Sequence, residues 1–415
     1  MNNIQRWFIF MNFLSVFCSQ AAGQVVEINQ LLLSALSDKR FLILSQANED
    51  LGRYKYDLPF VEKIEFRTET DRLLTSRQEF LARTSFNGFG QKKAENEKFK
   101  NLLNWKSYKT TEVRNEMLSL AYFDILNVLN LQEQLLISRD LLESYYRKEK
   151  IFENLMINGL SVDLSDYVSI KESILRQKAK IANTKNDLKS KLLQLQTDTS
   201  LTIPSKGVIS FDEAALIIQK ITTDFDSHIF LGRYDAEINY LSSVMLAEKA
   251  QVSKFVDFAQ VKYTVRDDLL LQNRFSVGLG FNIPWEGSYR LKQNETSIKL
   301  DVLKADKEVK KLELQVEFEN LKNNFELKYA HYYMLNEIIN DPAIKNLKEQ
   351  VIASGRLEPL KVVKMEESRM DITSKMFELK YEMLELYIRI LRSSGELFKT
   401  PYKNFLHPLI IPVSE

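Results

Sequence analysis

The sequence predicts a mainly α-helical protein with a small β part, built from two tandem copies of one long structural unit. Matching residues recur about 196 positions apart, in the pairs Asp71 and Asp267, Phe80 and Phe275, and Gly159 and Gly355. Residues 92–158 and 288–339 contain neither glycine nor proline, and uninterrupted stretches of this length indicate helices much longer than the globular norm. Each copy is therefore expected to hold two strands followed by a long helical hairpin.

The expected elements follow one another along the 415 residues. A signal peptide at 1–23 comes first. The first half then holds an N-terminal helix at 24–58, a strand pair at 59–88 and a helical hairpin at 89–199 with its tip near 158–161. After a connector at 200–226, the second half holds a helix at 227–254, a second strand pair at 255–286, a second hairpin at 287–393 with its tip near 354–357, and an irregular tail at 394–415. Asn340-Asp341-Pro342 should break the second long helix, because proline cannot continue it.

The helical segments carry apolar residues at coiled-coil spacing. Separations of three and four residues alternate through Val302, Ala305, Val309, Leu312 and Val316. Every seventh position is apolar through Ala121, Val128, Leu135 and Leu142. This spacing indicates hydrophobic seams along which long helices pack side by side.

Residues 274–284 alternate between large apolar and small or polar side chains, which predicts a strand with two different faces. The face expected to meet lipid carries Phe275, Val277, Leu279, Phe281 and Ile283. Segments 256–266, 63–69 and 79–86 alternate in a similar way, and the opposite face is expected to carry Lys63, Arg67, Lys262 and Arg266. Such alternation is typical of a membrane strand between lipid and a watery lumen. An ordinary half-buried sheet of a soluble domain would alternate too.

Four strands alone cannot close a sheet within a bilayer. An open edge in lipid leaves backbone groups unpaired, at several kcal/mol for each group. Small closed barrels begin at about eight strands. If the strands lie in lipid, copies of the chain must join, and two copies would give eight strands whereas three would give twelve.

Residues 1–23 have the composition of a secretory signal. Arg6 precedes the apolar run 7–17, and small residues precede a plausible cleavage point at Gln24. Cys18 is the one cysteine of the chain, and it is expected to leave with this segment. Lipidation at Cys18 is the alternative, although the bulky Phe17 stands where lipidation signals have a small residue. No later apolar stretch approaches the roughly 18 residues that indicate a membrane-spanning helix.

The overall composition argues against several other functions. The chain has 57 basic and 56 acidic residues, and a neutral balance of this kind does not favour nucleic acid as a partner. Its three histidines, His228, His331 and His407, are far apart in sequence. With no cysteine after the signal, neither a metal site nor a cofactor site is predicted, and we expect no enzyme.

Three segments together resemble one family. Residues 275–309 are similar to the strand-to-helix passage of TolC-like outer-membrane efflux proteins, and residues 156–188 and 352–391 look like their two hairpin tips. The resemblance spans nearly all of the mature chain. It implies a homotrimer that forms a twelve-stranded β-barrel in outer-membrane lipid and continues as an α-helical barrel into the periplasm. It also implies a periplasmic adaptor protein and an inner-membrane transporter as partners.

The resemblance further implies roles for residues at the two tips. The adaptor-docking turns fall on Gly159, Leu160, Ser161, Gly355, Arg356 and Leu357. The candidates for the periplasmic aperture are Asp163, Ser165, Asp166, Lys361 and Lys364. Family members often carry an aspartate six positions after each tip glycine, where this chain has Ser165 and Lys361, so a constriction of mixed charge is more plausible than an acidic one.

The expected function is therefore that of an exit duct in a tripartite efflux or type I secretion system. The alternative is a periplasmic coiled-coil adaptor or structural scaffold whose strands form a small soluble sheet. A relative of the family that has lost its pump and serves as an envelope spacer is a third possibility. The sequence identifies neither the transported substrate nor the class of pump.

Overall fold

A computed structural model describes residues 27–54, 57–70, 78–158, 164–195, 203–204, 207–252, 254–265, 270–281, 287–342 and 359–413. The expected signal peptide at 1–23, with Cys18, lies outside these residues. Helices dominate the described chain, and one four-stranded sheet and one two-stranded sheet complete it. No helix within the described ranges is long and apolar enough to cross a membrane.

The chain divides into two compact units, which are described separately below. The sheet unit comprises Lys39–Arg114 and Asp224–Glu313, and the hairpin unit comprises Met1–Asp38, Asn115–Thr223 and Leu314–Glu415. Two long helices, α4 (Phe89–Ile157) and α8 (Gly287–Asn340), have their first part in the sheet unit and their last part in the hairpin unit. Helix α8 ends at Asn340, where the Asp341-Pro342 pair follows.

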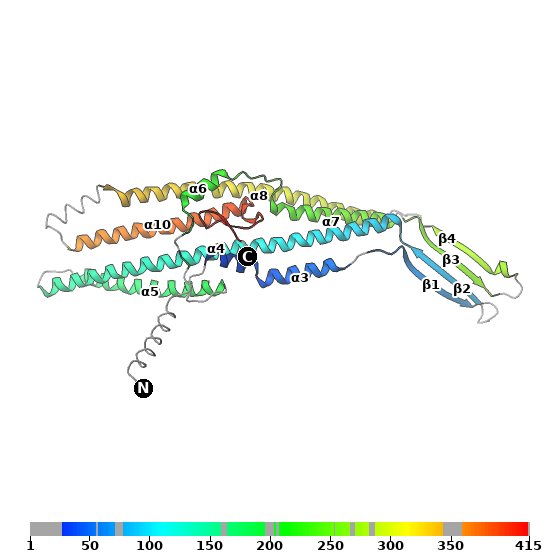
Figure 1. The fold of residues 1–415 in the computed structure, drawn as a ribbon, viewed down its shortest axis with the longest axis horizontal. Coiled ribbons are helices and arrows are strands. Elements are labelled where there is room, and N and C mark those ends of the chain that lie inside the picture. Colours follow the sequence, from blue (N-terminus) through cyan, green and yellow to red (C-terminus); the bar gives the residue numbers. More distant parts are fainter. Residues whose placement is uncertain are drawn as a thin grey trace, which may run out of the picture. The chain divides into compact units, whose positions relative to one another are not determined.

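The helices of the sheet unit lie in the order α3 (Lys39–Arg53), α4, α7 (Ile229–Val252) and α8 (Figure 1). Between α3 and α4, the side-chain amide of Asn48 donates hydrogen bonds to the Thr110 hydroxyl and to the Lys106 carbonyl oxygen. Between α4 and α7, the rings of Trp105 and Tyr240 stack with their centroids 5.4 Å apart. Aromatic and polar contacts thus join neighbouring helices in a single layer.

Helix α7 packs closely against its neighbours on both sides. A Cβ atom at Gly232 would lie 2.8 Å from Cε1 of Tyr108 on α4, so this glycine allows the ring to lie against the backbone of α7. On the other side, the Lys307 ammonium of α8 lies 2.6 Å from the Asp235 carboxylate. Helix α7 therefore lies between α4 and α8, and α3 and α8 are the outer helices of the layer.

Every helix of this layer adjoins a strand in the chain, and the sheet repeats the order of the helices. Its strands are β1 (Val61–Thr70), β2 (Gln78–Phe86), β3 (Val256–Thr264) and β4 (Phe275–Phe281), and a short 3₁₀ helix, η2 (Leu271–Arg274), precedes β4. Neighbouring strands are antiparallel, in the order β1-β2-β3-β4. Strands β1 and β4 are consequently the edges of the sheet.

Two β-bulges occur at one end of the sheet. The pairing of β1 shifts between Val61 and Lys63, and that of β3 shifts between Val256 and Phe258. Each bulge accommodates one extra residue, Glu62 in β1 and Asp257 in β3, which breaks the strict alternation of faces. The bulges therefore place two carboxylates near the junction of the sheet with its helices.

In the hairpin unit the helices lie in the order α5 (Leu164–Gln194), α4, α10 (Pro359–Ser393) and α8. Three ion pairs mark this order, Lys191 with Asp124 at 3.2 Å, Lys148 with Glu367 at 2.9 Å and Lys328 with Glu382 at 2.5 Å. The predicted seam residues Ala121, Val128 and Leu135 of α4 are buried in this unit. The core also contains the fully buried rings of Tyr122 and Tyr387.

The tail beyond residue 394 was expected to be irregular, and it is ordered instead. It forms the 3₁₀ helix η3 (Glu396–Phe398) and a two-stranded sheet of β5 (Lys403–Asn404) and β6 (Ile411–Pro412). Tyr122 holds this tail, because its hydroxyl donates to the Lys403 carbonyl oxygen at 2.5 Å and accepts from the Phe405 amide at 3.2 Å. Burial raises the pKa of the Tyr122 hydroxyl well above its usual range.

The single N-terminal helix expected at 24–58 is two helices, α2 (Ile28–Leu36) and α3. Helix α2 buries leucine side chains in the hairpin unit, whereas α3 belongs to the sheet unit. The helix is therefore interrupted at Ser37-Asp38, and the chain contributes one helix to each unit. The connector expected at 200–226 carries one described helix, α6 (Phe211–Lys220), which begins with a capping box formed by Ser210 and Glu213.

Candidate functional site: a two-faced sheet with open edges

One face of the four-stranded sheet is apolar across its whole width. The register aligns Phe66, Ala82, Val261 and Val277 across the four strands. The next apolar row consists of Ile64, Thr84, Ala259 and Leu279. Phe66 and Val277 are 79% and 76% exposed, so the middle of this face is uncovered within the unit. Large exposed apolar surfaces of this kind mark interaction sites with a protein or a membrane.

Aromatic rings lie at both ends of the apolar face. At one end Tyr263 lies between Phe80 and Phe275, with ring centroids 6.5 and 4.9 Å away. At the other end, near the helices, the ring pairs are Phe60 with Phe86 at 5.3 Å and Phe255 with Phe281 at 5.2 Å. An apolar band flanked by two aromatic rows is the pattern that membrane strands show at the two interfaces of a bilayer.

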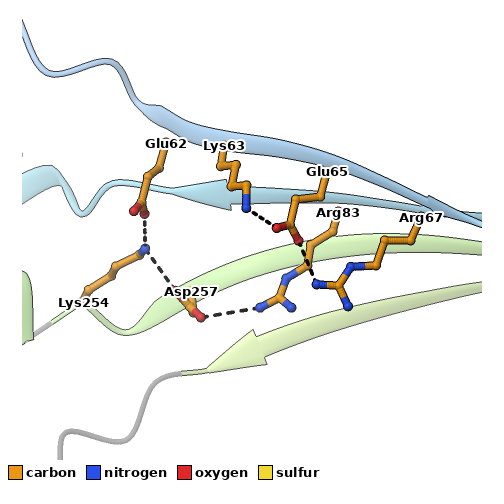
Figure 2. Close-up of polar contacts among 7 residues, drawn as sticks. All are labelled: Glu62, Lys63, Glu65, Arg67, Arg83, Lys254 and Asp257. Carbon is orange, nitrogen blue, oxygen red and sulfur yellow. Dashed lines mark hydrogen bonds and ion pairs between the residues drawn. The ribbon is translucent and has the colours of Figure 1, made fainter.

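The opposite face carries charged side chains that pair with each other. Figure 2 shows Glu65 between Lys63 and Arg67 on β1, with the Arg67 guanidinium 3.7 Å from the carboxylate. Further along the same face, the Lys262 ammonium lies 2.5 Å from the Glu79 carboxylate. The register brings Arg67 and Lys262 to one row, as alternation predicted, although Arg266 lies outside the described residues. The face is polar but nearly balanced in charge.

Lys254, just before β3, joins the two bulges. Its ammonium lies 2.8 Å from the Glu62 carboxylate and 3.0 Å from the Asp257 carboxylate, and its side chain is almost completely buried (Figure 2). Burial by itself would lower the pKa of Lys254, but hydrogen bonds to Glu62 and Asp257 outweigh it and raise the pKa above its usual value. Lys254 therefore stays charged and links β1 to β3 across β2.

Sequence reasoning missed this cluster, although a signal for it exists. In a strictly alternating strand the two neighbours of Glu62 would point to one face, and so would the two neighbours of Asp257. In the sheet they do not, so each acidic residue interrupts the alternation of its strand. An acidic residue at such a break indicates a bulge with a carboxylate available for a partner. Lys254 stands three residues before Asp257, but its contact with Glu62 could not be inferred, because Lys254 and Glu62 are far apart in sequence.

A stacked pair of side chains lies beside this cluster on the polar face. The guanidinium carbon of Arg83 is 3.4 Å from the ring centroid of Phe258, and one of its terminal nitrogens is 3.8 Å from the Asp257 carboxylate. A guanidinium close to a ring face is stabilised by the ring quadrupole. The Phe258 ring in turn covers Gly280 of β4, where a Cβ atom would fall well inside contact distance. Gly280 thus leaves space for an aromatic ring on the face that carries the charged side chains.

Gly280→Ala should destabilise the sheet by about 1–3 kcal/mol, because the new methyl group forces the Phe258 ring away from Arg83. Gly278→Ala is the matched control, since its Cβ would meet only the flexible side chain of Gln260 at 3.0 Å. Unfolding by denaturant in detergent measures both variants. Adding Phe258→Ala should remove most of the penalty of Gly280→Ala, and equal stabilities of the two glycine variants would contradict this account.

The sheet has two open edges. Within the part of the chain that the structure describes, no strand pairs with the outer side of β1 or of β4. Their outward N–H and C=O groups are therefore available to another strand. The predicted lipid-facing residues Phe275, Val277, Leu279 and Phe281 lie on β4, and each is more than half exposed, whereas Ile283 lies outside the described residues.

The residues predicted at the hairpin tips are only partly described. Gly159, Leu160, Ser161, Asp163, Gly355, Arg356 and Leu357 all lie outside the described residues. Ser165 and Asp166 are exposed in the first turn of α5, and Lys364 is exposed near the start of α10. Lys361 belongs to α10, but its side chain is not described.

Among the described residues, no three His, Cys, Asp or Glu side chains gather in the way a metal ion needs. On the polar face, the carboxylates of Glu65 and Glu79 pair with lysine or arginine side chains. No protein-family model matches the sequence, and no curated protein matches it.

Solved structures of outer-membrane channels share the fold at low sequence identity. A membrane protein from Pseudomonas aeruginosa superposes with a TM-score of 0.66 at 12% identity, over 89% of this chain and 93% of that chain. The outer membrane protein VceC from Vibrio cholerae gives 0.64 at 12%, over 89% and 96%. The MtrE outer membrane channel from Neisseria gonorrhoeae, in an open state, gives 0.62 at 10%, over 89% and 88%. These matches confirm the resemblance at the level of the fold, and the chain has the fold of these outer-membrane proteins.

Proposed function

We propose that the chain is an exit duct of the bacterial outer membrane. The observation that carries the proposal is the four-stranded sheet, which is apolar and aromatic on one face, charged on the other and open at both edges. A sheet of this kind fits a wall between lipid and water, and it needs further copies to remove its edges. The fold shared with outer-membrane channels supports the same conclusion.

Three copies complete the duct in this proposal. Strand β4 of one copy pairs with β1 of the next, which preserves the antiparallel order because β1 and β4 run in opposite directions. Three sheets of four strands then close a barrel of twelve. The long helices continue from the barrel into the periplasm as an α-helical barrel, as the resemblance implies.

The two faces of the sheet take different roles in the barrel. Phe66, Val277 and their neighbours face the acyl chains, and the aromatic rows lie at the two interfaces of the bilayer. The paired charges around Glu65 and Lys254 face the lumen. Because positive and negative groups alternate there, the upper pore offers no single-sign field to select a cargo by charge.

The hairpin tips are the proposed docking sites for a periplasmic adaptor, which connects the duct to an inner-membrane transporter. The docking turns are Gly159, Leu160, Ser161, Gly355, Arg356 and Leu357, and the aperture candidates are Asp163, Ser165, Asp166, Lys361 and Lys364. Docking would separate the tip helices, and the energy for transport would come from the inner-membrane partner. The chain itself carries out no chemical step in this proposal.

Membrane fractionation and reconstitution test the proposal together. The full chain should sediment with the outer membrane, resist a carbonate wash, and form a three-copy species in detergent by mass photometry. Reconstituted into planar bilayers, it should conduct ions. A chain that washes off the membrane and stays folded as a monomer without detergent would instead be the periplasmic adaptor or scaffold, and the duct would be wrong.

A further inference from the structure

The guanidinium of Arg83, on the polar face of β2, is held more closely by an aromatic ring than by a carboxylate. Its carbon lies 3.4 Å from the centroid of the Phe258 ring. The carboxylate that pairs with it, that of Asp257, is 3.8 Å from a terminal nitrogen, which is beyond the length of a hydrogen bond. The Nε–H group has no hydrogen-bond partner among the described residues. Arg83 therefore keeps N–H donors for a further acceptor.

The carboxylates around Arg83 are shared with other cations. Glu65 stands opposite Arg83 in the register, but it pairs with two cations of its own strand. Asp257 lies closer to the Lys254 ammonium, at 3.0 Å. The seven charged residues drawn in Figure 2 are four cations and three carboxylates. The nearby carboxylates thus leave the positive charge of Arg83 only partly compensated.

The stack of Arg83 on Phe258 spans three strands of the sheet. The Phe258 ring, from β3, takes the place that a side chain at Gly280 of β4 would fill. Arg83 reaches the face of this ring from β2, on the other side of β3. Its side chain remains 28% exposed, so the guanidinium can be reached from the polar face.

From this arrangement we infer that the stack of Arg83 on Phe258 is a binding site for planar aromatic anions. The edge of the guanidinium would donate hydrogen bonds to a carboxylate or sulfonate group of the ligand. Its face away from Phe258 would stack on the aromatic ring of the ligand. The inference rests on the proposed function, because it takes the polar face as the wall of the lumen, and it names a class of cargo. Three copies would carry three such sites at one level of the barrel.

Selection at this site acts by direct contact. The charges of the lumen are nearly balanced, so a long-range field does not concentrate a cargo of one sign. A planar aromatic anion can use both the N–H donors and the flat surface of Arg83. A cation of the same shape would be repelled, and a non-planar anion would form the hydrogen bonds without the stacking contact.

Binding of three small probes to the wild-type trimer in lipid nanodiscs tests the inference. Benzoate is a planar aromatic anion, cyclohexanecarboxylate is a non-planar anion of similar size, and benzylammonium is an aromatic cation. Saturation-transfer difference NMR measures the three dissociation constants. Benzoate should bind about tenfold more tightly than either of the other probes. Equal affinities of the three probes would overturn the inference without the use of any variant.

Two arginine variants locate the binding. Arg83→Gln should weaken benzoate binding about tenfold, whereas Arg67→Gln should leave it unchanged. Arg67 is a matched control, because it lies on the same face, 3.7 Å from the Glu65 carboxylate, and has no ring contact among the described residues. Arg83→Lys keeps the charge but loses the planar donor group, so it should also bind benzoate more weakly. Mass photometry verifies that each variant forms the three-copy species.

The outcomes separate this inference from the proposed function. Normal benzoate binding by an intact trimer of Arg83→Gln or of Arg83→Lys overturns the site and leaves the duct standing. The same holds for an equal loss of binding in Arg67→Gln, which would indicate a general effect of charge. A wild-type chain that forms no trimer and conducts no ions overturns the duct, and the inference with it.

Discussion

Val277→Arg should keep most of the chain from assembling in the outer membrane. Val277 lies in an inner row of the apolar face and is 76% exposed, so in the proposed barrel the substitution would place a cation near the centre of the bilayer. An arginine at that depth on a barrel strand costs about 2–4 kcal/mol. A ring of three copies would carry the cost three times, roughly 6–12 kcal/mol, which is comparable to the stability of a whole domain.

The neighbouring position provides the control. Ser276 lies on the same strand but on the polar face, so the arginine of Ser276→Arg would meet water. It would stand opposite the like charge of Lys262, which costs up to about 1 kcal/mol, well below the cost expected for Val277→Arg. The amount of folded trimer in the outer-membrane fraction measures both variants. If Val277→Arg and Ser276→Arg assemble equally well, the face carrying Val277 does not meet lipid, and the assignment of the two faces is wrong.

Leu160→Asp combined with Leu357→Asp should reduce export to that of cells lacking the chain. Both residues belong to the predicted docking turns, where a small apolar side chain beside a glycine would enter the adaptor interface. A carboxylate buried there without a partner opposes docking strongly. Survival in a panel of toxic compounds measures export, and the same cells must retain normal amounts of the trimer in the outer membrane.

A conservative pair distinguishes docking from folding of the tips. Leu160→Met with Leu357→Met keeps an apolar side chain of similar volume at each turn, and export should stay close to normal. If the aspartate variant exports normally while its trimer is intact, these leucines do not dock the adaptor. If both pairs lose the trimer, the tips serve assembly and the docking assignment again fails.

The cluster around Lys254 gives the sheet a defined attachment to its helices. A single ammonium holds the bulged residues of β1 and β3, and the stacked Arg83 extends the cluster to β2. A link of this kind opposes rotation of one strand pair against the other at the end of the sheet that adjoins the helices. The duplicated halves of the chain are thus joined by contacts that neither half contains alone.

Much of the architecture could be predicted because its signals are periodic and local. The repeat at about 196 residues, the stretches without glycine or proline and the alternation at 274–284 each reflect a constraint along the chain itself. Helix α4 and strands β1 to β4 lie within the expected segments for this reason. The ordered tail was missed, because its order depends on the Tyr122 hydroxyl, which is distant in sequence.

By itself the sequence determined the long helices, the four strands of the larger sheet, their order and the two faces of those strands away from the bulges, since these follow from the spacing of apolar side chains. Only the tertiary structure decided which faces meet. It placed the apolar residues of four strands in one register, showed that Lys254 joins two bulges, and left the predicted seam residues Val302, Val309, Leu312 and Val316 of α8 exposed. The physical reason is that the spacing of apolar residues shows which side chains need to be buried. Which residues bury them depends on contacts between parts of the chain that are far apart in sequence.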